Sequence, residues 1–342
     1  MIEIKKEGII LRKTGLNFES EGVLNPAVIQ ENGKIHLLYR AVAKGNFSSI
    51  GYCVLSEPLT VESRSDSPII IPEFEHEKHG IEDPRIVKID DLFYLTYTSY
   101  NGINALGTLA TSKDLKSWKK VGIIVPRIPY EKFKFLLESE GLIPEKYKRY
   151  NEFQISHPDS VPIFLWDKNL IFFPRKINGK FYFLHRIRPD IQIANVENIQ
   201  DLNFEFWEDY FSHFKDHIFL CPKYDHESSY IGGGCPPIET EYGWLMIYHG
   251  VHDTIDGYVY SACVALLELE NPEKEICRLP YPLFEPEKEW EIKGEVNNVC
   301  FPTGAIVEKD TLYIYYGAAD ERIAVASLSI SKLLKELMMH AI

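Results

Sequence analysis

The feature that most constrains the fold is a segment that recurs five times along the 342-residue chain. Each copy contains a proline, an apolar segment with period-two alternation, a tight turn and a second segment rich in aromatic residues. The copies are residues 25–40, 83–97, 173–186, 236–249 and 301–316. Turns such as Asn32-Gly33 and Asn178-Gly179 are typical of β-hairpins. The repeat therefore predicts five hairpins, each with a proline at the first residue of its first strand, where no ladder hydrogen bond is lost.

A further strand follows most of the hairpins, as in residues 106–114. Four strands per copy and five copies predict an all-β fold, a five-bladed β-propeller that forms a single domain over residues 1–342. A β-sandwich is the alternative, but it would not explain why a proline opens each repeated hairpin. A hydrophobic content of 45% is sufficient for a sizeable core.

Two segments outside the repeat have the pattern of helices. The longest gap between copies, about residues 127–160, combines apolar residues at helical spacing with many charges, which predicts a helical insertion between blades. Residues 331–342 predict a short C-terminal helix with Ser331 as its N-cap. The apolar stripe of this helix, which we expect to dock on the core, consists of Leu333, Leu334, Leu337 and Met338.

Composition excludes several classes of function. A formal net charge of −13 argues against nucleic-acid binding, which requires basic patches. No apolar run has the length of a membrane helix, and the first residues do not resemble a secretion signal. The six cysteines form no CxxC pair or disulfide framework, and the eleven histidines form no HExxH motif. We therefore expect a cytoplasmic protein with free thiols and no metal site.

Unusual polar residues occupy equivalent positions in the repeat. Asn25 and Asp83 precede the proline of the first and second copies. Four further polar residues follow the second strand of a copy: Arg40, Arg186, His249 and Asp320. Since a hairpin brings the start of one strand beside the end of its partner, these groups should converge on one rim of the central channel.

Asp83 is the strongest candidate for a general acid at this rim. Glycoside hydrolysis ordinarily uses two carboxylates, but only Asp320 offers a convincing second one here. Glu82 should point to the opposite face of its strand, because side chains alternate along a strand. The alternative for Asp83 is a turn carboxylate that caps backbone amides.

The rest of the rim is cationic, which is unusual in an acidic chain. Arg40, Arg186 and His249, together with Lys168, predict a bound anion, and arginine matches phosphate oxygens well. Phosphate is already ionised, so as a nucleophile it needs no general base. One acid and a phosphate clamp are the groups that an inverting phosphorylase requires.

Several short segments occur in a specific order between about Gly22 and Ala326. They are residues 25–27, 38–41, 80–85, 111–115, 173–180, 233–238, 247–251 and 315–320. In these segments the chain resembles the mannoside phosphorylases of glycoside hydrolase family 130. Those enzymes are five-bladed propellers that phosphorolyse β-mannosides with inversion and release α-mannose 1-phosphate.

The resemblance implies roles for individual residues. Asp83 matches the family's general acid, which is thought to pass its proton through the 3-hydroxyl of mannose. The residues that match phosphate contacts are Lys168, Arg186, His249 and Tyr260. Those expected to contact the sugar are Asn25, Arg40 and Asp320, with Tyr100 and Asn101 from an adjacent loop. Inorganic phosphate would be the co-substrate, with no cofactor, and association into a homo-oligomer is a further expectation.

The resemblance leaves alternatives open. The family also contains inverting β-mannosidases that use water, although retention of Lys168, Arg186 and His249 favours phosphorolysis. A non-catalytic sugar-binding propeller would lose the acid, so Asp83 argues against it. Substrates of the mannobiose, manno-oligosaccharide, mannosyl-glucose and mannosyl-N-acetylglucosamine types all fit. The chain departs from the family at Pro26, where some members have a serine near the phosphate.

Overall fold

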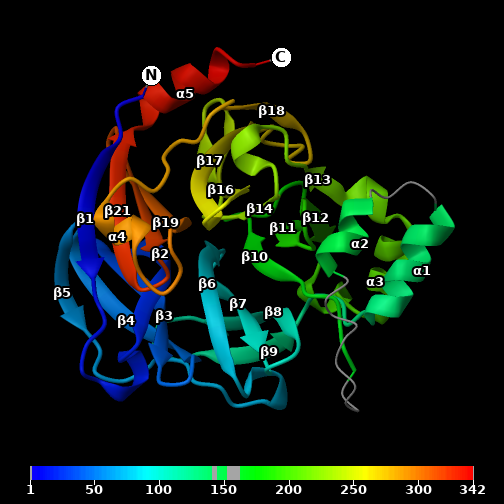
Figure 1. Cartoon of the computed structure of the whole chain (residues 1–342), viewed down its shortest axis with the longest axis horizontal. Helices are drawn as coiled ribbons and strands as arrows, with labels where there is room; N and C mark the ends of the chain where they lie inside the picture. Colours follow the sequence, from blue (N-terminus) through cyan, green and yellow to red (C-terminus); the bar gives the residue numbers. More distant parts are fainter. Residues whose placement is uncertain (1, 141–144, 152–161, 342) are drawn as a thin grey trace.

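The computed structural model describes residues 2–140, 145–151 and 162–341 of the protein. The described residues are mostly β-strand, as the sequence predicts, and they form four hydrogen-bonded sheets (Figure 1). None of the helices within these residues is long and apolar enough to cross a membrane. All six cysteines are free thiols.

The largest sheet consists of two antiparallel groups of four strands. The first group is β2 (Gly22–Glu31), β3 (Lys34–Ala43), β4 (Phe47–Glu57) and β5 (Thr60–Arg64); the second is β6 (Gly80–Ile89), β7 (Leu92–Tyr100), β8 (Ala105–Ser112) and β9 (Lys119–Ile123). A single parallel bridge between Ser48 and Gly80 joins them. Gly80 has φ +143°, and a β-carbon on it would lie 2.8 Å from the Ser48 nitrogen, so this junction requires glycine.

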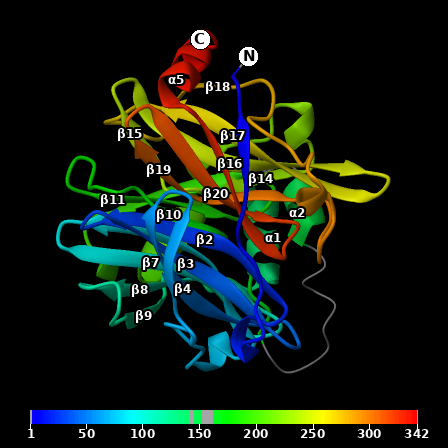
Figure 2. The ribbon, with the colours of Figure 1, turned by 90° about the vertical axis from the view of Figure 1, so that its left-hand side faces the viewer.

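The other three sheets have the same four-stranded antiparallel order. The third group is β10 (Lys168–Phe172), β11 (Phe181–Arg186), β12 (Ile191–Val196) and β13 (Ile218–Leu220). The fourth is β14 (Tyr230–Gly233), β16 (Gly243–Thr254), β17 (Gly257–Leu267) and β18 (Glu275–Arg278), with β15 (Ile238–Thr240) beside β16. The fifth is β19 (Cys300–Glu308), β20 (Thr311–Ala318), β21 (Arg322–Ser329) and β1 (Lys5–Leu11). Because β1 pairs with β21, the fifth group joins both ends of the chain. Figures 1 and 2 accordingly show the two termini at the same end of the molecule.

The five groups follow one another around the molecule in chain order (Figure 1). Their first strands are neighbours: β2 contacts β6 and β19, and β10 contacts β6 and β14. Five buried hydrophobic clusters lie between consecutive groups, and one of them packs the fifth group against the first. Each group therefore buries both faces against its neighbours, and apolar burial is the main force that stabilises this arrangement.

The prolines do not open the strands, so that part of the prediction was wrong. Pro26 and Pro84 lie inside β2 and β6, at positions where the strand pairing is interrupted. Pro174 follows β10, and Pro236 and Pro237 lie between β14 and β15. A β-bulge leaves one residue without ladder hydrogen bonds, which permits proline in the interior of a strand.

Two helices form within the predicted insertion, and part of that segment lies outside the described residues. They are α1 (Tyr130–Glu140) and α2 (Glu145–Asn151). The sequence analysis missed α3 (Phe204–Ser212), which follows the third group and begins at the N-cap Asn203. Phe133 of α1 packs against Phe211 of α3, with ring centroids 6.0 Å apart, so the two helices share one apolar cluster.

The C-terminal helix forms, with small differences from the prediction. Helix α5 spans Ile330–Met338, and its N-cap is Ser329, whose side chain accepts a hydrogen bond from the Lys332 amide. Ser331 therefore lies inside the first turn. Leu333, Leu334 and Leu337 are buried in the core, as expected, whereas Met338 is 39% exposed and does not belong to the buried stripe.

A buried glutamate precedes the first strand in four of the five groups. Glu77 in the short helix η2 (Glu75–Glu77), for example, accepts hydrogen bonds from Tyr97 in β7 and Lys120 in β9. The four sets of glutamate, tyrosine and cation are Glu19–Tyr39–Arg64, Glu77–Tyr97–Lys120, Glu227–Tyr248–Arg278 and Glu291–Tyr316–Lys6. The tyrosine always lies on the second strand and the cation on the outermost strand. We call each set a glutamate clamp, because it ties the start of a group to its far edge.

The third group replaces the clamp with a different arrangement. His185 occupies the position of the tyrosine on β11 and contacts Asp167 at 2.8 Å and Tyr210 of α3 at 2.7 Å. These side chains are buried, so the third group also joins its second strand to neighbouring segments through polar contacts.

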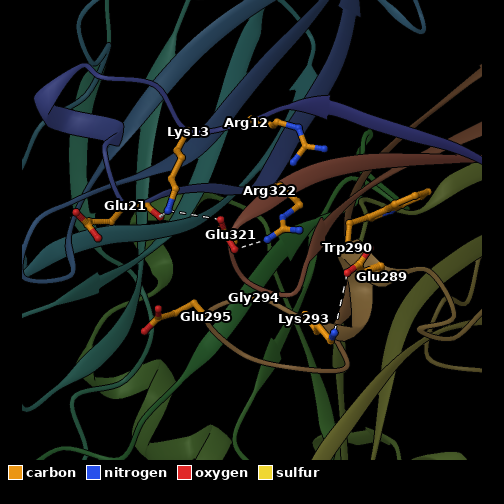
Figure 3. Close-up of a pocket in the computed structure, with 10 residues that line it drawn as sticks. All are labelled: Arg12, Lys13, Glu21, Glu289, Trp290, Lys293, Gly294, Glu295, Glu321 and Arg322. Atoms are coloured by element: carbon orange, nitrogen blue, oxygen red, sulfur yellow. Dashed lines mark hydrogen bonds and ion pairs between the residues drawn. The ribbon is translucent and has the colours of Figure 1, made fainter.

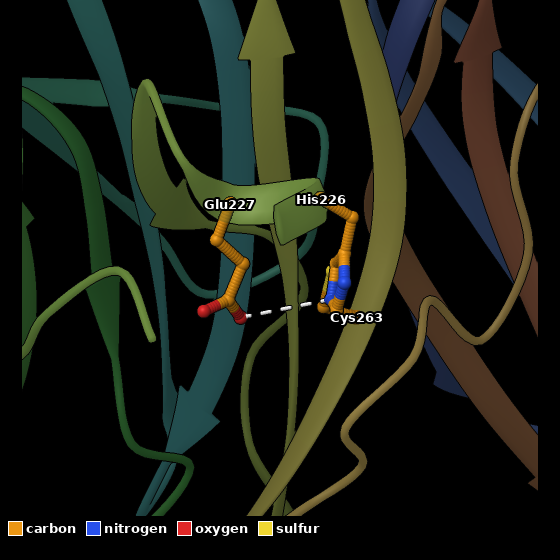
Figure 4. Close-up of side chains that lie close together, drawn as sticks. All are labelled: His226, Glu227 and Cys263. Carbon is orange, nitrogen blue, oxygen red and sulfur yellow. Dashed lines mark ion pairs between the residues drawn. The ribbon is translucent and has the colours of Figure 1, made fainter. Parts of the chain in front are cut away.

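The glutamate of the fourth clamp belongs to the one set of three or more metal-ligand residue types found close together in the described chain. Figure 4 shows His226, Glu227 and Cys263 at this position. Glu227, however, already accepts hydrogen bonds from four donors. They are the backbone amides of Lys223 and Tyr224, the hydroxyl of Tyr248 and the guanidinium of Arg278. A cation would have to displace these donors, so the arrangement favours a structural role for Glu227.

Candidate active site

Three residues in left-handed conformation mark one end of the first three groups. Asn25, Asp83 and Asn169 have φ of 50°, 51° and 54°. Each lies where the pairing with the next strand is interrupted, which is the geometry of a bulge. Asparagine and aspartate tolerate this conformation better than other non-glycine residues. The equivalent of Asp83 in the third group is therefore Asn169 and not a residue beside Pro174.

Asp83 lies among donors and positive charges. Asn25 Nδ2 donates to Asp83 Oδ1 at 2.7 Å, and Arg40 Nη1 lies 3.7 Å from the same oxygen. Arg85 Nη1 donates to the backbone carbonyl of Asp83 at 2.9 Å. Burial opposes ionisation of Asp83, but the charges of Arg40 and Arg85 and the Asn25 hydrogen bond outweigh it and lower the pKa of this carboxyl.

Glu82 does not point away from the site, so that prediction was wrong. Its carboxylate accepts from Arg40 Nη2 at 2.9 Å and from Lys168 Nζ at 3.3 Å. The bulge and the left-handed conformation of Asp83 break the strict alternation of side chains on β6. Glu82 is thus a second carboxylate that neutralises two of the predicted cations.

A pocket of about 710 Å³ opens at this end of the strands. Its walls include Arg40, Glu82, Lys168 and Asp320. Tyr100 and Trp166 form an aromatic wall, with ring centroids 6.2 Å apart, and Lys168 Nζ lies 5.1 Å from the Trp166 ring. The pocket therefore combines charged groups that can bind hydroxyls with an aromatic surface.

Asp320 has a perturbed acidity within this pocket. Burial and the charge of Asp83 raise the pKa of Asp320 to about 6, although Arg40 acts in the opposite direction. Two neighbouring carboxyls thus differ in protonation, with Asp83 ionised and Asp320 protonated in mildly acidic solution.

We expect Asp320→Asn to stabilise the protein at neutral pH. The carboxyl of Asp320 has a higher pKa in the folded protein than in the unfolded chain, so the folded state holds its proton more tightly. This stabilises the fold fully below about pH 4, and the stabilisation is lost as the pH rises through 6. Asparagine does not ionise, so the variant does not lose this stability, which amounts to at most about 3 kcal/mol. Its melting temperature should exceed that of the wild type at pH 8 and approach it at pH 4. An equal difference between variant and wild type at both pH values would contradict this explanation.

Arg186 and His249 form a buried pair beside Asp83. Arg186 Nη1 lies 3.3 Å from His249 Nε2. The charge of Asp83 is close enough to favour the protonated form of Arg186. Burial and the nearby Arg188 lower the pKa of Arg186 to about 10. Burial and the charges of Arg186 and Arg85 lower the pKa of His249 well below its usual value. His249 is therefore neutral at pH 7, and the prediction that it adds positive charge was wrong.

The neutral histidine is placed to donate a hydrogen bond instead. With Nε2 accepting from Arg186, the proton lies on Nδ1, which has no partner in the described protein. The same is true of Arg186 Nε, Arg85 Nη2 and Asn169 Nδ2. Buried donors are normally satisfied, so this group of donors is suited to a ligand with several acceptor oxygens.

Glycine on β14 allows these side chains to meet. A β-carbon on Gly232 would lie 2.5 Å from both Asn169 Nδ2 and His249 Nε2. The two side chains therefore converge above Gly232. Tyr260 lies on the other side of His249, with ring centroids 6.1 Å apart, and its hydroxyl is hydrogen-bonded to that of Tyr230.

The helical insertion supports the segment that follows Arg186. Tyr147 of α2 donates to Asp190 Oδ2 at 2.7 Å, and Asn151 Nδ2 donates to the Arg188 carbonyl at 3.1 Å. The Arg188 guanidinium lies 4.4 Å from the Tyr230 ring centroid. Helix α2 thus holds the turn that places Arg188 near Arg186.

The structure brings nine of the ten predicted residues to this region and leaves one apart. Asn101 Oδ1 accepts hydrogen bonds from the amides of Ile103 and Asn104, at 3.0 and 2.7 Å, so its side chain closes a turn. It lines a different, smaller pocket. The residues that the sequence analysis did not identify are Glu82, Arg85, Trp166, Asn169, Arg188 and Tyr230. Their one signal in the sequence was proximity: all but Tyr230 lie within two residues of Asp83, Lys168 or Arg186.

Comparisons with known proteins agree with the fold. The family model of glycoside hydrolase family 130, described as beta-1,4-mannooligosaccharide phosphorylase, matches residues 12–339. The chain is 34% identical to a 1,2-beta-oligomannan phosphorylase of Thermoanaerobacter sp. (strain X514), over 96% of this chain and 98% of the relative. It is 36% identical to a beta-1,2-mannobiose phosphorylase of the same organism, over 92% of each chain.

A solved structure shares the fold over its full length. The beta-1,2-mannobiose phosphorylase from Listeria innocua, in complex with beta-1,2-mannobiose, superimposes with a TM-score of 0.74 at 24% identity. The match covers 99% of this chain and 100% of that chain. The family model spans residues 12–339, which include every residue of the site described above, and the two relatives match over 96% and 92% of the chain. The chain belongs to glycoside hydrolase family 130.

Proposed function

We propose that this protein is a phosphorylase that cleaves β-mannosides with inorganic phosphate and releases α-mannose 1-phosphate. The observation that carries the proposal is the buried group of donors around Arg186 and His249 beside the carboxyl of Asp83. Membership of the family and the names of the relatives support the same activity. We propose further that the five strand groups are the blades of a five-bladed β-propeller in a single domain over residues 1–342.

Asp83 is the proposed proton donor. A phosphate oxygen attacks the anomeric carbon, and the bond from that carbon to the glycosidic oxygen breaks. The departing oxygen takes the proton of the mannose 3-hydroxyl, which in turn receives the proton of Asp83, as the family resemblance implies. Attack from the face opposite the leaving group converts the β-mannoside into an α-phosphate. Phosphate serves as the nucleophile, so a second catalytic carboxylate is unnecessary.

The low pKa of Asp83 in the free protein is compatible with this role. Arg40, Arg85 and Lys168 favour its ionised form. A bound phosphate dianion would offset these cations and raise the pKa of the carboxyl. Asp83 would then hold its proton when both substrates are present, which is when the proton is needed.

The proposed phosphate contacts are those expected from the family resemblance, with two additions. They are Lys168, Arg186, His249 and Tyr260, to which we add Asn169 and Arg188 because of their positions. For the mannose unit we propose contacts from Asn25, Arg40, Asp320 and Tyr100. Asn101 is not included, because its side chain closes a turn.

We propose β-1,2-mannosides as the substrate class, since the two relatives described above are named for that linkage. The test is incubation with β-1,2-mannobiose or β-1,4-mannobiose, with and without phosphate, followed by detection of mannose 1-phosphate. Phosphate-dependent turnover of the β-1,2 substrate is the expected result. Turnover without phosphate would identify a mannosidase, and binding without turnover would identify a sugar-binding protein.

Arg186→Lys should weaken phosphate binding more than sugar binding. Lysine keeps the charge but loses the planar guanidinium fork that binds two phosphate oxygens at once. A hydrogen bond to a charged partner is worth about 2 kcal/mol, so kcat/KM for phosphate should fall roughly 30-fold. The Michaelis constant for the mannoside should change much less. Steady-state kinetics with each substrate varied in turn checks this, and equal losses for both substrates would contradict it.

A further inference from the structure

A buried polar pair lies directly behind two of the proposed phosphate contacts. Asp167 immediately precedes Lys168, the first residue of β10, and His185 immediately precedes Arg186, the last residue of β11. Lys168 and Arg186 are partners across the two strands. His185 Nδ1 donates to Asp167 Oδ2 at 2.8 Å, since an ionised carboxylate can only accept, and both side chains are at most 1% exposed. The pair therefore joins the two strand ends that carry these cations.

The pair is anchored on the side of β11 that faces away from the site. Successive side chains of a strand point to opposite faces, so His185 faces α3. There its Nε2 lies 2.7 Å from the Tyr210 hydroxyl, and its ring packs against that of Trp207 at a centroid distance of 5.7 Å. The amide of Asp167 donates to the carbonyl of Ala105 in β8 at 3.1 Å. Helix α3 and the neighbouring strand group thus fix the pair from two directions.

The contacts that the two cations make themselves are few and loose. Lys168 Nζ lies 3.3 Å from Glu82, and Arg186 Nη1 lies 3.3 Å from the neutral ring of His249. Each cation also lies beside an aromatic ring, 5.1 and 5.5 Å from its centroid. Arg186 Nε has no hydrogen-bond partner within the described residues. The place of each charge therefore depends largely on the position of its strand end.

Stability alone does not account for this pair. The other four groups place a tyrosine at the position of His185, and its hydroxyl donates to a buried glutamate. Asp167 instead uses one oxygen for the pair, and its buried Oδ1 has no partner in the part of the chain that the structure describes. A buried carboxylate oxygen without a donor opposes folding.

We propose that Asp167 and His185 are positioning residues for phosphate, which hold the ends of β10 and β11 so that the charges of Lys168 and Arg186 converge on the nucleophile. The inference rests on the proposed function and adds two residues that touch neither substrate. Small displacements of binding groups have large effects on affinity and rate, so loss of the pair should be visible in the kinetics.

The test begins with two substitutions of Asp167. Asp167→Ala should raise the Michaelis constant for phosphate about tenfold and change that for the mannoside much less. Asp167→Asn keeps an oxygen that accepts from His185 Nδ1, so its Michaelis constant for phosphate should stay within about threefold of the wild type. A purely structural loss would lower the fraction of folded enzyme, and therefore kcat, but not raise this constant. Steady-state kinetics with each substrate varied in turn, well below the melting temperature, measures the effects.

A double variant shows whether the two residues act as one pair. His185→Phe should match Asp167→Ala, and the double variant should again show about a tenfold effect, whereas independent residues would give about 100-fold. If His185→Phe does not fold, the comparison of Asp167→Ala with Asp167→Asn decides alone.

Tyr316→Phe is the matched control. Tyr316 occupies the position of His185 in the fifth group, donates to the buried Glu291 at 2.5 Å, and is followed by Gly317 in place of a cation. It should leave the Michaelis constant for phosphate unchanged. The proposal is overturned if this constant is unchanged in Asp167→Ala, if it rises equally in Asp167→Asn or Tyr316→Phe, or if the effects of the double variant are additive.

A wild type that releases no mannose 1-phosphate would instead count against the proposed function. Calorimetric titration with inorganic phosphate then tests the pair, since it measures binding without turnover. Its control addresses phosphate that binds elsewhere. A pocket of about 630 Å³, which shares lining residues with the active-site pocket, also carries cations, among them Arg12, Lys13 and Arg322 (Figure 3).

Arg12→Ala should therefore leave the affinity for phosphate unchanged. About tenfold weaker binding in Asp167→Ala but not in Arg12→Ala supports the proposal. Equal affinity of Asp167→Ala and the wild type, a similar loss in Arg12→Ala, or no binding of phosphate to the wild type rejects it.

Discussion

Asp83→Asn should lower kcat for phosphorolysis of mannobiose by roughly 100-fold or more. The substitution keeps the shape of the side chain but removes the proton that the departing oxygen needs. The Michaelis constant for phosphate should change little, since the donors around Arg186 and His249 remain. The initial rate of mannose 1-phosphate release measures the effect.

The leaving group distinguishes a lost acid from a distorted site. An aryl mannoside whose phenol is strongly acidic releases a phenolate that needs no proton. Its phosphorolysis should therefore be nearly unaffected by Asp83→Asn. If both substrates lose activity equally, the proton-donor assignment is wrong. Asp320→Asn is the informative comparison, because the raised pKa of Asp320 makes it the competing donor. If the loss of activity depends on the leaving group in Asp320→Asn but not in Asp83→Asn, Asp320 is the proton donor.

The repeat predicted much of the fold because its signals are local. Alternating apolar residues and Asn-Gly turns predicted the hairpins, and the structure contains β2–β3, β6–β7 and β19–β20 as paired strands. The equivalence of Asn25 and Asp83 also held, since both are bulged residues in left-handed conformation. What the pattern could not predict is where each proline lies relative to the strand ends.

The rest of the site depends on interactions that no local pattern reports. A single bulge turns Glu82 toward Arg40 and Lys168, against the expectation from alternation. Without a proline, Asn169 did not match the repeat, although it has the conformation of Asp83. The neutrality of His249 arises from burial among arginines of two distant segments, with Arg85 in β6 and Arg186 and Arg188 at or just after the end of β11. Each of these features is set by tertiary contacts.

The glutamate clamps have consequences for stability and for catalysis. Glu77 lies six residues before Asp83 in the chain, and its clamp holds the start of β6 against β7 and β9. Glu77 is fully buried and Lys120 is 6% exposed. Burial opposes ionisation of Glu77, but the hydrogen bonds from Lys120, a backbone amide and Tyr97 outweigh it and lower the pKa. Glu77 is therefore charged at neutral pH and closely surrounded by donors.

Glu77→Gln should destabilise the protein and also lower kcat. Removing one partner of a buried ion pair leaves Lys120 with only the longer contact to the exposed Glu73, 3.7 Å away, at a cost of at most about 3 kcal/mol. Because the clamp fixes the strand that carries Asp83, its loss should reduce kcat by about tenfold while the Michaelis constant for phosphate changes little. Melting temperature and steady-state kinetics, measured well below the melting temperature of the variant, check the two effects.

Glu291→Gln is the matched control for this prediction. Glu291 is equally buried, binds Lys6 and Tyr316 in the same way, and precedes β19, which carries no titratable side chain of the site. It should lose similar stability but retain kcat. The stability gap between Glu77→Gln and the wild type should narrow toward acid pH, since protonation of Glu77 removes the same ion pair. If both variants lose kcat in proportion to stability, the clamp of Glu77 supports only the fold and does not position Asp83.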